Sequence, residues 1–285
     1  MTYYKKADWV QEQLGKGEVV IVDARYALND SEAGRRAYEE GHIPGAYYVD
    51  LSQDLSSPKR PDGAGGRHPL PDPAALAALL GSMGISRTTT VVAYDDQGGA
   101  MASRLRWLLQ WLGHDGTVYL LEGGYAGWVA AGYEVTTDAP AYVDNVRYDY
   151  ELNNAILVDQ SYVKSKIGQA GTVIIDSREA PRYRGEVEPL DPSAGHIPTA
   201  INRFWSEGKH TDGTWKSPEE QAERFAGLSK DDEIIVYCGS GVTATPNFFA
   251  LQDAGFKNVK LYAGSWSDWS SNPKNPVAVG EEEKA

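Results

Sequence analysis

Residues 41–46 read GHIPGA, and residues 195–200 read GHIPTA, 154 positions later. A second pair of segments precedes them at nearly the same offset, since VDAR at 22–25 returns as IDSR at 175–178. Self-similarity at one long offset is typical of a duplicated domain. These two pairs therefore predict that the chain contains two copies of one fold.

Two further matches continue the repeat through the rest of each copy. The run TVVAYD, which ends at Asp95, matches EIIVYC, which ends at Cys238. The run EGGYAGW at 122–128 then matches YAGSWSDW at 262–269. Four matches in the same order indicate a tandem repeat, and only the second copy carries a cysteine.

At 285 residues the chain is long enough for two domains that each bury a core. We expect the first domain over residues 1–135, a polar linker over 136–154 and the second domain over 155–285. The offset between the copies falls from 154 to 143 residues after the GHIP segments, so the first copy has about eleven extra residues. They fall in the Pro-, Gly- and Ser-rich stretch 55–70, where we expect a functional loop.

Each copy alternates predicted strands and helices. In the second copy, apolar β-branched runs indicate strands and helical spacing indicates helices, the strands at 172–176, 233–237 and 259–262 and the helices at 218–228 and 245–255. Alternation of this kind predicts an α/β fold in which a mainly parallel sheet carries helices on both faces. The strand runs lack an alternating polar face, as expected for strands covered on both sides.

The composition argues against several classes of function. With 27 Lys and Arg against 40 Asp and Glu, the net charge of −13 repels phosphate backbones and anionic lipids, so we expect neither nucleic acid nor membrane as a partner. One cysteine and five scattered histidines cannot supply a disulfide or the common metal sites, and we expect no metal. The N-terminus has no apolar run of signal-peptide length, so we expect a cytoplasmic, reducing compartment.

The lone cysteine lies at a position suited to chemistry. Cys238 ends a predicted strand and is followed by the turn GSGVTA at 239–244, which leads into a helix with Pro246 in its first turn and Gly255 after its end. In such a turn, backbone N–H groups and the helix N-terminus favour a thiolate. Open α/β sheets bind ligands at the C-terminal ends of their strands, which favours a nucleophile over the alternative, a small buried apolar residue.

The tandem repeat, the GHIP segments, the CGSGVTA loop and the GSWSDW ending together resemble the two-domain rhodanese-family sulfurtransferases, from about Lys5 to Pro276. The resemblance implies two tandem rhodanese-like domains, of which the C-terminal one is catalytic. The N-terminal one is non-catalytic, since Asp95 stands where the other copy has Cys238. It further implies a Cys238 persulfide that receives sulfur from a small donor and passes it to a thiol, cyanide or a thioredoxin-like dithiol without a cofactor. Backbone N–H groups can stabilise the persulfide anion, and the loop residues predicted to bind substrate are Gly239, Gly241, Val242 and Thr243.

The loop after Cys238 has no charged side chain, which is similar to the 3-mercaptopyruvate sulfurtransferases rather than to the thiosulfate type. In that group a loop serine transfers a proton together with a histidine and an aspartate of the other domain. Ser240 matches the serine and His68 matches the histidine, which implies a site between the domains. The aspartate position is occupied by Ser52, so its identity stays open between Asp50 and Asp54.

The residues expected to bind the donor's negative charge give a mixed result. Arg182 matches the first of two arginines that mercaptopyruvate-type enzymes share, but Leu190 occupies the second position. Arg184 lies close to Arg182 in sequence, and the segment with Arg67 and His68 adds a further positive group. The loop favours 3-mercaptopyruvate and the missing arginine argues against it, so both 3-mercaptopyruvate and thiosulfate remain open as donors.

Two alternatives to a turnover sulfurtransferase can be stated. A cysteine-based phosphatase requires an arginine at the end of the loop, and this chain has Ala244 and Thr245 there, which argues against it. A persulfide carrier or interaction module without turnover is the second alternative, and steady-state turnover would distinguish it from an enzyme. His42 and His196 recur in both copies, including the one without a cysteine, so we expect a structural role for them.

Overall fold

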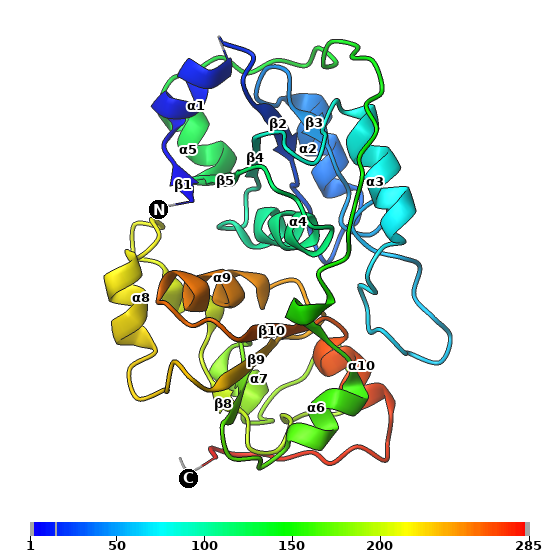
Figure 1. The fold of residues 1–285 in the computed structure, drawn as a ribbon, viewed down its shortest axis with the longest axis vertical. Coiled ribbons are helices and arrows are strands. Elements are labelled where there is room, and N and C mark those ends of the chain that lie inside the picture. The colour runs from blue at the N-terminus through cyan, green and yellow to red at the C-terminus, as the bar shows by residue number, and fades with distance from the viewer. Residues whose placement is uncertain (1–2, 15, 283–285) are drawn as a thin grey trace. The chain divides into compact units, whose positions relative to one another are not determined.

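The computed structural model describes residues 3–14 and 16–282, which form two compact units (Figure 1). Unit 1 contains the chain up to Ser57 together with Pro71–Asn153 and Gly213–Trp215. Unit 2 contains Pro58–Leu70, Asn154–Asp212 and the chain from Lys216 onward. The segment Pro58–Leu70, which we call the 58–70 loop, therefore belongs to the first copy in sequence and to unit 2 in space.

Unit 1 is built on a five-stranded parallel sheet in the order β1-β5-β4-β2-β3. Its strands are β1 (Tyr4–Lys5), β2 (Val20–Asp23), β3 (Tyr47–Tyr48), β4 (Val91–Tyr94) and β5 (Val118–Leu121). Its helices are α1 (Ala7–Leu14), α2 (Ala33–Glu40), α3 (Pro73–Ser82), α4 (Ala100–Trp111) and α5 (Gly124–Ala130).

Unit 2 repeats this topology with the order β6-β10-β9-β7-β8, again parallel throughout. Its strands are β6 (Leu157–Val158), β7 (Thr172–Asp176), β8 (Ile201–Asn202), β9 (Glu233–Tyr237) and β10 (Val259–Tyr262). Its helices are η1 (Asn154–Ile156), α6 (Gln160–Lys166), α7 (Ala180–Tyr183), η2 (Trp205–Gly208), α8 (Pro218–Arg224), α9 (Thr245–Asp253) and α10 (Ser265–Ser271). The predicted α/β fold with two equivalent parallel sheets is confirmed.

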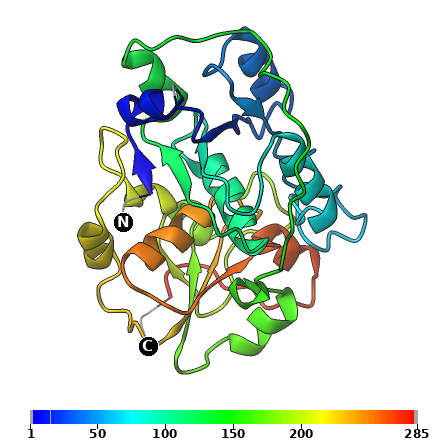
Figure 2. The same cartoon turned by 45° about the horizontal axis from the view of Figure 1, so that its top comes forward.

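The central strand of unit 2 explains why its sequence is apolar without alternation. All five residues of β9 are buried, and the strand pairs with β7 on one side and β10 on the other. Helices α8 and α9 lie on one side of the sheet and α6, α7 and α10 on the other (Figure 1), and the orange helix α9 runs alongside the strands in Figure 2. A strand covered on both faces cannot present a polar side.

The sequence predicted the C-terminal end of helix α9 well and that of helix α8 poorly. Helix α9 was predicted over 245–255 and ends at Asp253, with Gly255 in the left-handed region at φ +90°. Helix α8 was predicted to run to residue 228, and that prediction is wrong because the helix ends at Arg224. Gly227 adopts φ +90°, which turns the chain away from the helical path directly after it.

The repeated Asp–Arg pairs join the repeated segments to one another. In unit 1 the Arg25 guanidinium donates to the Asp23 carboxylate at 2.6 Å and to the Gly41 carbonyl at 2.7 Å, and both charged side chains are buried. In unit 2 the Arg178 guanidinium makes the equivalent bonds to Asp176 and to Gly195, both at 2.6 Å. The recurring sequence thus encodes a buried ion pair that ties the strand end to the GHIP segment.

The GHIP histidines have the structural environment that the repeat predicts. His42 Nδ1 donates to the Tyr38 carbonyl at 2.8 Å, and its ring stacks on that tyrosine at 3.8 Å. His196 Nδ1 likewise donates to the Tyr183 carbonyl at 2.7 Å and stacks on its ring at 3.9 Å. Both contacts are made within their own unit, so they support the fold in each copy.

We expect Arg25→Met to lower the free energy of unfolding by about 3 to 5 kcal/mol, because it leaves the Asp23 carboxylate buried without its ion-pair partner. Urea unfolding followed by tryptophan fluorescence would measure the loss. Arg36→Met is the control, since Arg36 pairs with Asp30 at the surface, and its urea midpoint should equal that of the unmodified protein. Equal effects of the two substitutions would contradict this account.

Candidate active site

Cys238 is held at the end of β9 through its backbone. Its N–H donates to the Ser265 hydroxyl at 3.1 Å, and its carbonyl accepts from the Trp266 N–H at 2.9 Å. The next carbonyl, that of Gly239, accepts from the Ser267 N–H at 2.9 Å. The first turn of α10 therefore fixes where the loop of the cysteine begins, and only 1% of Cys238 is exposed.

The remainder of the loop turns tightly into α9. Gly241 has φ +75°, and a Cβ on it would lie 2.1 Å from the Ala263 carbonyl oxygen, so only glycine fits there. The Thr245 N–H and hydroxyl both donate to the Val242 carbonyl, at 3.0 and 2.7 Å. These contacts give the loop one conformation from Cys238 to the helix.

The matching loop of unit 1 shows what this geometry does for an anion. Asp95 stands at the position of Cys238, and the loop has a left-handed glycine, Gly98, at the place of Gly241. Four backbone N–H groups donate to the Asp95 carboxylate at 2.8 to 3.0 Å, those of Gln97, Gly99, Met101 and Ala102. Burial raises the pKa of the Asp95 carboxyl, and these four donors oppose the rise. A loop of this shape is a backbone cradle for negative charge.

The 58–70 loop brings His68 to the loop of the cysteine. His68 Nδ1 lies 2.8 Å from the Ser240 hydroxyl oxygen, and both residues are buried. The two residues that the sequence singled out for proton transfer are therefore in hydrogen-bond contact within unit 2. A histidine and a hydroxyl in such contact can pass a proton to a group bound beside Cys238.

Two guanidinium groups lie next to the residue after the cysteine. A Cβ on Gly239 would lie 2.9 Å from Nη2 of Arg67 and 3.4 Å from Nη1 of Arg182. The two arginines share Asp191, whose carboxylate accepts from both, and Arg182 also donates to Glu188 at 2.6 Å. Burial raises the pKa of Asp191, and the Arg67 hydrogen bond opposes that rise. The two cations are thus available to an anion at the loop while acidic partners hold them in place.

The other predicted charged residues are not brought to this group. The Arg184 guanidinium is bonded to Glu186 at 2.7 Å and to Glu281 at 3.3 Å. In unit 1, Asp50 accepts from the Ser52 N–H and hydroxyl, both at 2.7 Å, and Asp54 accepts from the Asp50 N–H at 2.7 Å. The bonds of the two aspartates stabilise their own turn, so they do not decide which one would complete a proton relay.

Sequence reasoning missed the acidic residues that hold the two arginines. Glu188 and Asp191 follow Arg182 in the short stretch GEVEPLDP, and their side chains are almost fully inaccessible. Acidic residues in a Pro-rich stretch are usually solvated loop residues, so their sequence gave no reason to place them in a site. The burial of their carboxylates against two arginines is a signal that only the folded chain provides.

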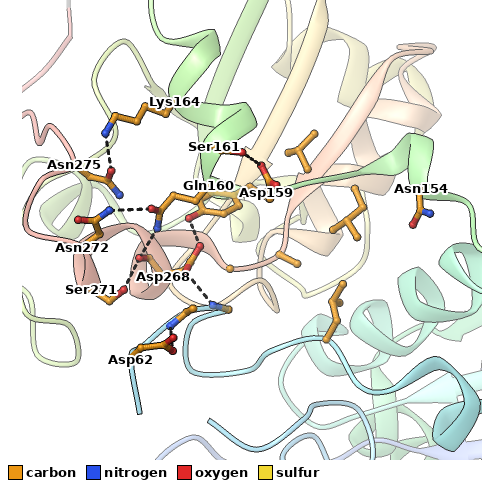
Figure 3. Close-up of a pocket in the computed structure, with 18 of the residues that line it drawn as sticks. Asp62, Asn154, Asp159, Gln160, Ser161, Lys164, Asp268, Ser271, Asn272 and Asn275 are labelled. Carbon is orange, nitrogen blue, oxygen red and sulfur yellow. Dashed lines mark hydrogen bonds between the residues drawn. The ribbon is translucent and has the colours of Figure 1, made fainter. Parts of the chain in front are cut away.

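A cavity of about 1060 Å³ opens beside α6, and Figure 3 shows its polar lining. Lys164, Asn272 and Asn275 line one part of it, with Lys164 bonded to Asn275 at 3.3 Å. Its lining includes Gly264 and Asp268 of the turn that holds Cys238, but not Cys238 itself. The described contacts of the 239–244 loop with Arg67 and His68 thus lie outside the lining of this cavity.

Across residues 3–14 and 16–282, no three histidine, cysteine or acidic side chains gather into a group that could hold a metal ion. Over the same part of the chain, no helix has the length and apolar composition needed to cross a membrane.

Comparison with known proteins gives one consistent family. The rhodanese-like domain family matches residues 6–131 and 159–272. A probable 3-mercaptopyruvate sulfurtransferase of Pseudomonas aeruginosa is 45% identical over 278 residues, covering 96% of this chain and 97% of the relative. The putative thiosulfate sulfurtransferase SseB of Mycobacterium tuberculosis is 36% identical, covering 92% of this chain and 91% of the relative.

A solved structure agrees with the sequence relatives. The crystal structure of SseA from Escherichia coli, described as a 3-mercaptopyruvate sulfotransferase with the rhodanese fold, superposes with a TM-score of 0.81 at 32% identity. The match covers 93% of this chain and 99% of that chain. The similarity therefore extends over both copies of the repeat.

We expect Asp95→Asn to destabilise unit 1 by about 2 to 4 kcal/mol, because the amide NH₂ would face backbone N–H donors that now share a carboxylate. Urea unfolding would measure the change. Asp144→Asn, at an exposed position of unit 1 away from this loop, is the control and should leave the midpoint unchanged. Equal stability of Asp95→Asn and the unmodified protein would show that the cradle does not need an anion.

Proposed function

The chain belongs to the rhodanese family of sulfurtransferases, and we propose that it moves a sulfane sulfur through a persulfide on Cys238. Cys238 is the one cysteine of the chain, and it lies at the C-terminal end of the central strand β9. The matching loop of unit 1 binds a carboxylate with four backbone N–H groups, which supports the same role for this loop toward an anionic sulfur.

In the first half-reaction, the Cys238 thiolate attacks the sulfur atom of the donor. A new S–S bond forms between the two sulfurs, and the bond that joined the donor's sulfur to its parent breaks. The electron pair of that bond leaves with the parent molecule. From 3-mercaptopyruvate the pair leaves on carbon, which must take a proton to give pyruvate, whereas from thiosulfate it leaves as sulfite without needing a proton on carbon.

The contact between His68 and Ser240 favours 3-mercaptopyruvate as the donor. His68 Nδ1 and Ser240 Oγ are 2.8 Å apart, and both are buried beside the loop of the cysteine. A proton-transferring pair serves a carbon leaving group and is of little use to sulfite. The 45% identical relative from Pseudomonas aeruginosa, named a probable 3-mercaptopyruvate sulfurtransferase, agrees with this choice.

The donor carboxylate has two cations within its reach. Leu190 occupies the place of the second arginine that mercaptopyruvate-type enzymes share, but Arg67 of the 58–70 loop lies beside Gly239 together with Arg182. A charge-assisted bond from each guanidinium can orient the carboxylate next to Cys238. The arginine that seemed to be missing in sequence therefore has a counterpart in Arg67.

In the second half-reaction, a thiophilic acceptor takes the outer sulfur and restores the Cys238 thiolate. Cyanide and small thiols are suitable acceptors, and we propose a thioredoxin-like dithiol as a protein acceptor. We also propose a cytoplasmic, reducing compartment, because the mechanism requires Cys238 to return to its reduced form after each turnover.

His68→Ala should lower kcat/KM for 3-mercaptopyruvate by about 100-fold or more and lower that for thiosulfate much less, because only the first leaving group needs a proton. His210→Ala, which removes a half-exposed histidine of unit 2, is the control and should leave both values unchanged. Cys238→Ser should abolish turnover of both donors. Equal losses for the two donors in His68→Ala would contradict the proton role.

Arg182→Ala should raise KM for 3-mercaptopyruvate by about 10-fold or more, the loss expected for one charge-assisted bond. Arg184→Ala provides the comparison, since its guanidinium is bonded to Glu186 and Glu281, and its KM should stay the same. Steady-state kinetics of pyruvate formation would measure both. An unchanged KM in Arg182→Ala would remove this residue from the site.

A further inference from the structure

We propose that the first turn of α10, residues 264–268, is a positioning element that sets the 58–70 loop against the loop of Cys238. The proposal rests on the proposed function, because it assigns to this turn the placement of His68 for proton transfer. The residues that would do this are Ser265, Ser267 and Asp268.

One side of the turn holds the cysteine. The Ser265 hydroxyl accepts the Cys238 N–H at 3.1 Å and donates to the Tyr262 carbonyl at 2.9 Å, so it connects the ends of two neighbouring strands. Ser265 is fully buried and has φ +56°, a left-handed conformation that is unfavourable for a residue with a Cβ. The strained conformation is therefore compensated by what the hydroxyl of Ser265 binds.

The other side of the turn binds the 58–70 loop, which carries His68. The Gly65 N–H donates to Oδ1 of Asp268 at 2.9 Å, and the Arg67 N–H donates to the Ser267 hydroxyl at 3.0 Å. The second carboxylate oxygen of Asp268 accepts from the Tyr262 hydroxyl at 2.5 Å, which orients the carboxylate. Figure 3 shows Asp268 directed toward the loop that carries Asp62, with dashed lines along the two bonds that its carboxylate accepts.

The glycines of the 58–70 loop allow it to approach the turn this closely. A Cβ on Gly66 would lie 2.4 Å from both the Gly264 carbonyl oxygen and the Ser267 hydroxyl. Gly63, Gly65 and Gly66 all have φ between +75° and +83°. Backbone therefore packs directly on backbone, and His68 follows two residues after the closest contact.

Unit 1 provides an internal comparison, because it contains the same turn without the nucleophile. The Tyr125 N–H donates to the Asp95 carbonyl at 3.0 Å, as the Trp266 N–H does to Cys238 in unit 2 at 2.9 Å. Gly124 has φ +57°, nearly the value of Ser265. The fold therefore requires this backbone conformation in both copies.

The side chains of the two turns share a tryptophan and differ in their polar residues. Trp128 and Trp269 match and are fully buried in their own cores. The three polar residues of the unit 2 turn, however, have no polar equivalents, since Ser265, Ser267 and Asp268 correspond to Gly124, Ala126 and Gly127. Polar side chains that occur only in the copy with the cysteine serve the site rather than the fold.

The test compares two sets of variants with both donors. Ser267→Ala combined with Asp268→Asn weakens the hold on the 58–70 loop, so kcat for 3-mercaptopyruvate should fall about 10- to 100-fold and that for thiosulfate much less. Ser265→Ala acts on Cys238, so kcat should fall for both donors alike. Ser165→Ala, which removes a hydrogen bond within α6 at an exposed position, is the control.

A double-mutant cycle separates positioning from general destabilisation. In a His68→Ala background, Ser267→Ala with Asp268→Asn should cause no further loss of kcat with 3-mercaptopyruvate, because His68 is the group of this loop that transfers the proton, whereas Arg67 acts on donor binding and therefore on KM. Losses that multiply in the combined variant, or equal losses with both donors, would overturn the proposal.

Amide hydrogen exchange of the resting protein tests the contact without any donor. The Gly65 and Arg67 amides should be protected in the unmodified protein and in Ser165→Ala, and should exchange faster when Ser267 and Asp268 are replaced. Unchanged exchange would overturn the proposed hold on the loop. If the unmodified protein did not turn over 3-mercaptopyruvate, the proposed function would fail, while this exchange experiment would still decide whether the turn holds the loop.

Discussion

Negative charge at the C-terminal end of a central strand depends on the backbone N–H groups of the loop that follows, and in unit 2 that loop has no charged side chain of its own. In unit 1 this charge is the Asp95 carboxylate, which accepts hydrogen bonds from four such N–H groups. In unit 2 a thiol stands at the same place. The tight glycine turn at Gly241 and the bonds from α10 maintain the loop shape on which the chemistry depends.

The two copies therefore use one backbone design for different purposes. In unit 1 the protein's own Asp95 occupies the cradle, and its hydrogen bonds contribute to the stability of that unit. In unit 2 Cys238 stands at that position, and we propose that the loop there stabilises a sulfur that arrives with a donor. The residues that we propose for proton transfer and donor binding, His68 and Arg67, come from the 58–70 loop, which belongs to the first copy in sequence and to unit 2 in space.

Much of this could be predicted from sequence because it depends on local or repeated patterns. The tandem repeat gave the two equivalent sheets, the apolar runs gave the central strands, and the loop after β9 gave Cys238 and Ser240. His68 was found through the family resemblance, and its contact with Ser240 agrees with that assignment. Arg67 and Arg182 were both considered, but the sequence could not show that they share one acidic partner.

The rest could not be predicted because its interactions involve backbone groups or residues distant in sequence. Ser267 and Asp268 hold the N–H groups of Arg67 and Gly65, and a contact with a backbone N–H leaves no mark on the identity of the residue that carries it. The early end of α8, by contrast, had a sequence signal, because Gly227 is a left-handed glycine like Gly255 after α9. The differences between the two copies are the one sequence signal that could have indicated the α10 turn.

The central claim is that sulfur is carried by Cys238 during the reaction. The most direct measurement is mass spectrometry of the protein after incubation with 3-mercaptopyruvate in the absence of an acceptor, together with the amount of pyruvate released. We predict one added sulfur atom on the peptide that contains Cys238 and one pyruvate for each sulfur bound. Continued release of pyruvate and sulfide with no sulfur ever found on Cys238 would contradict the account.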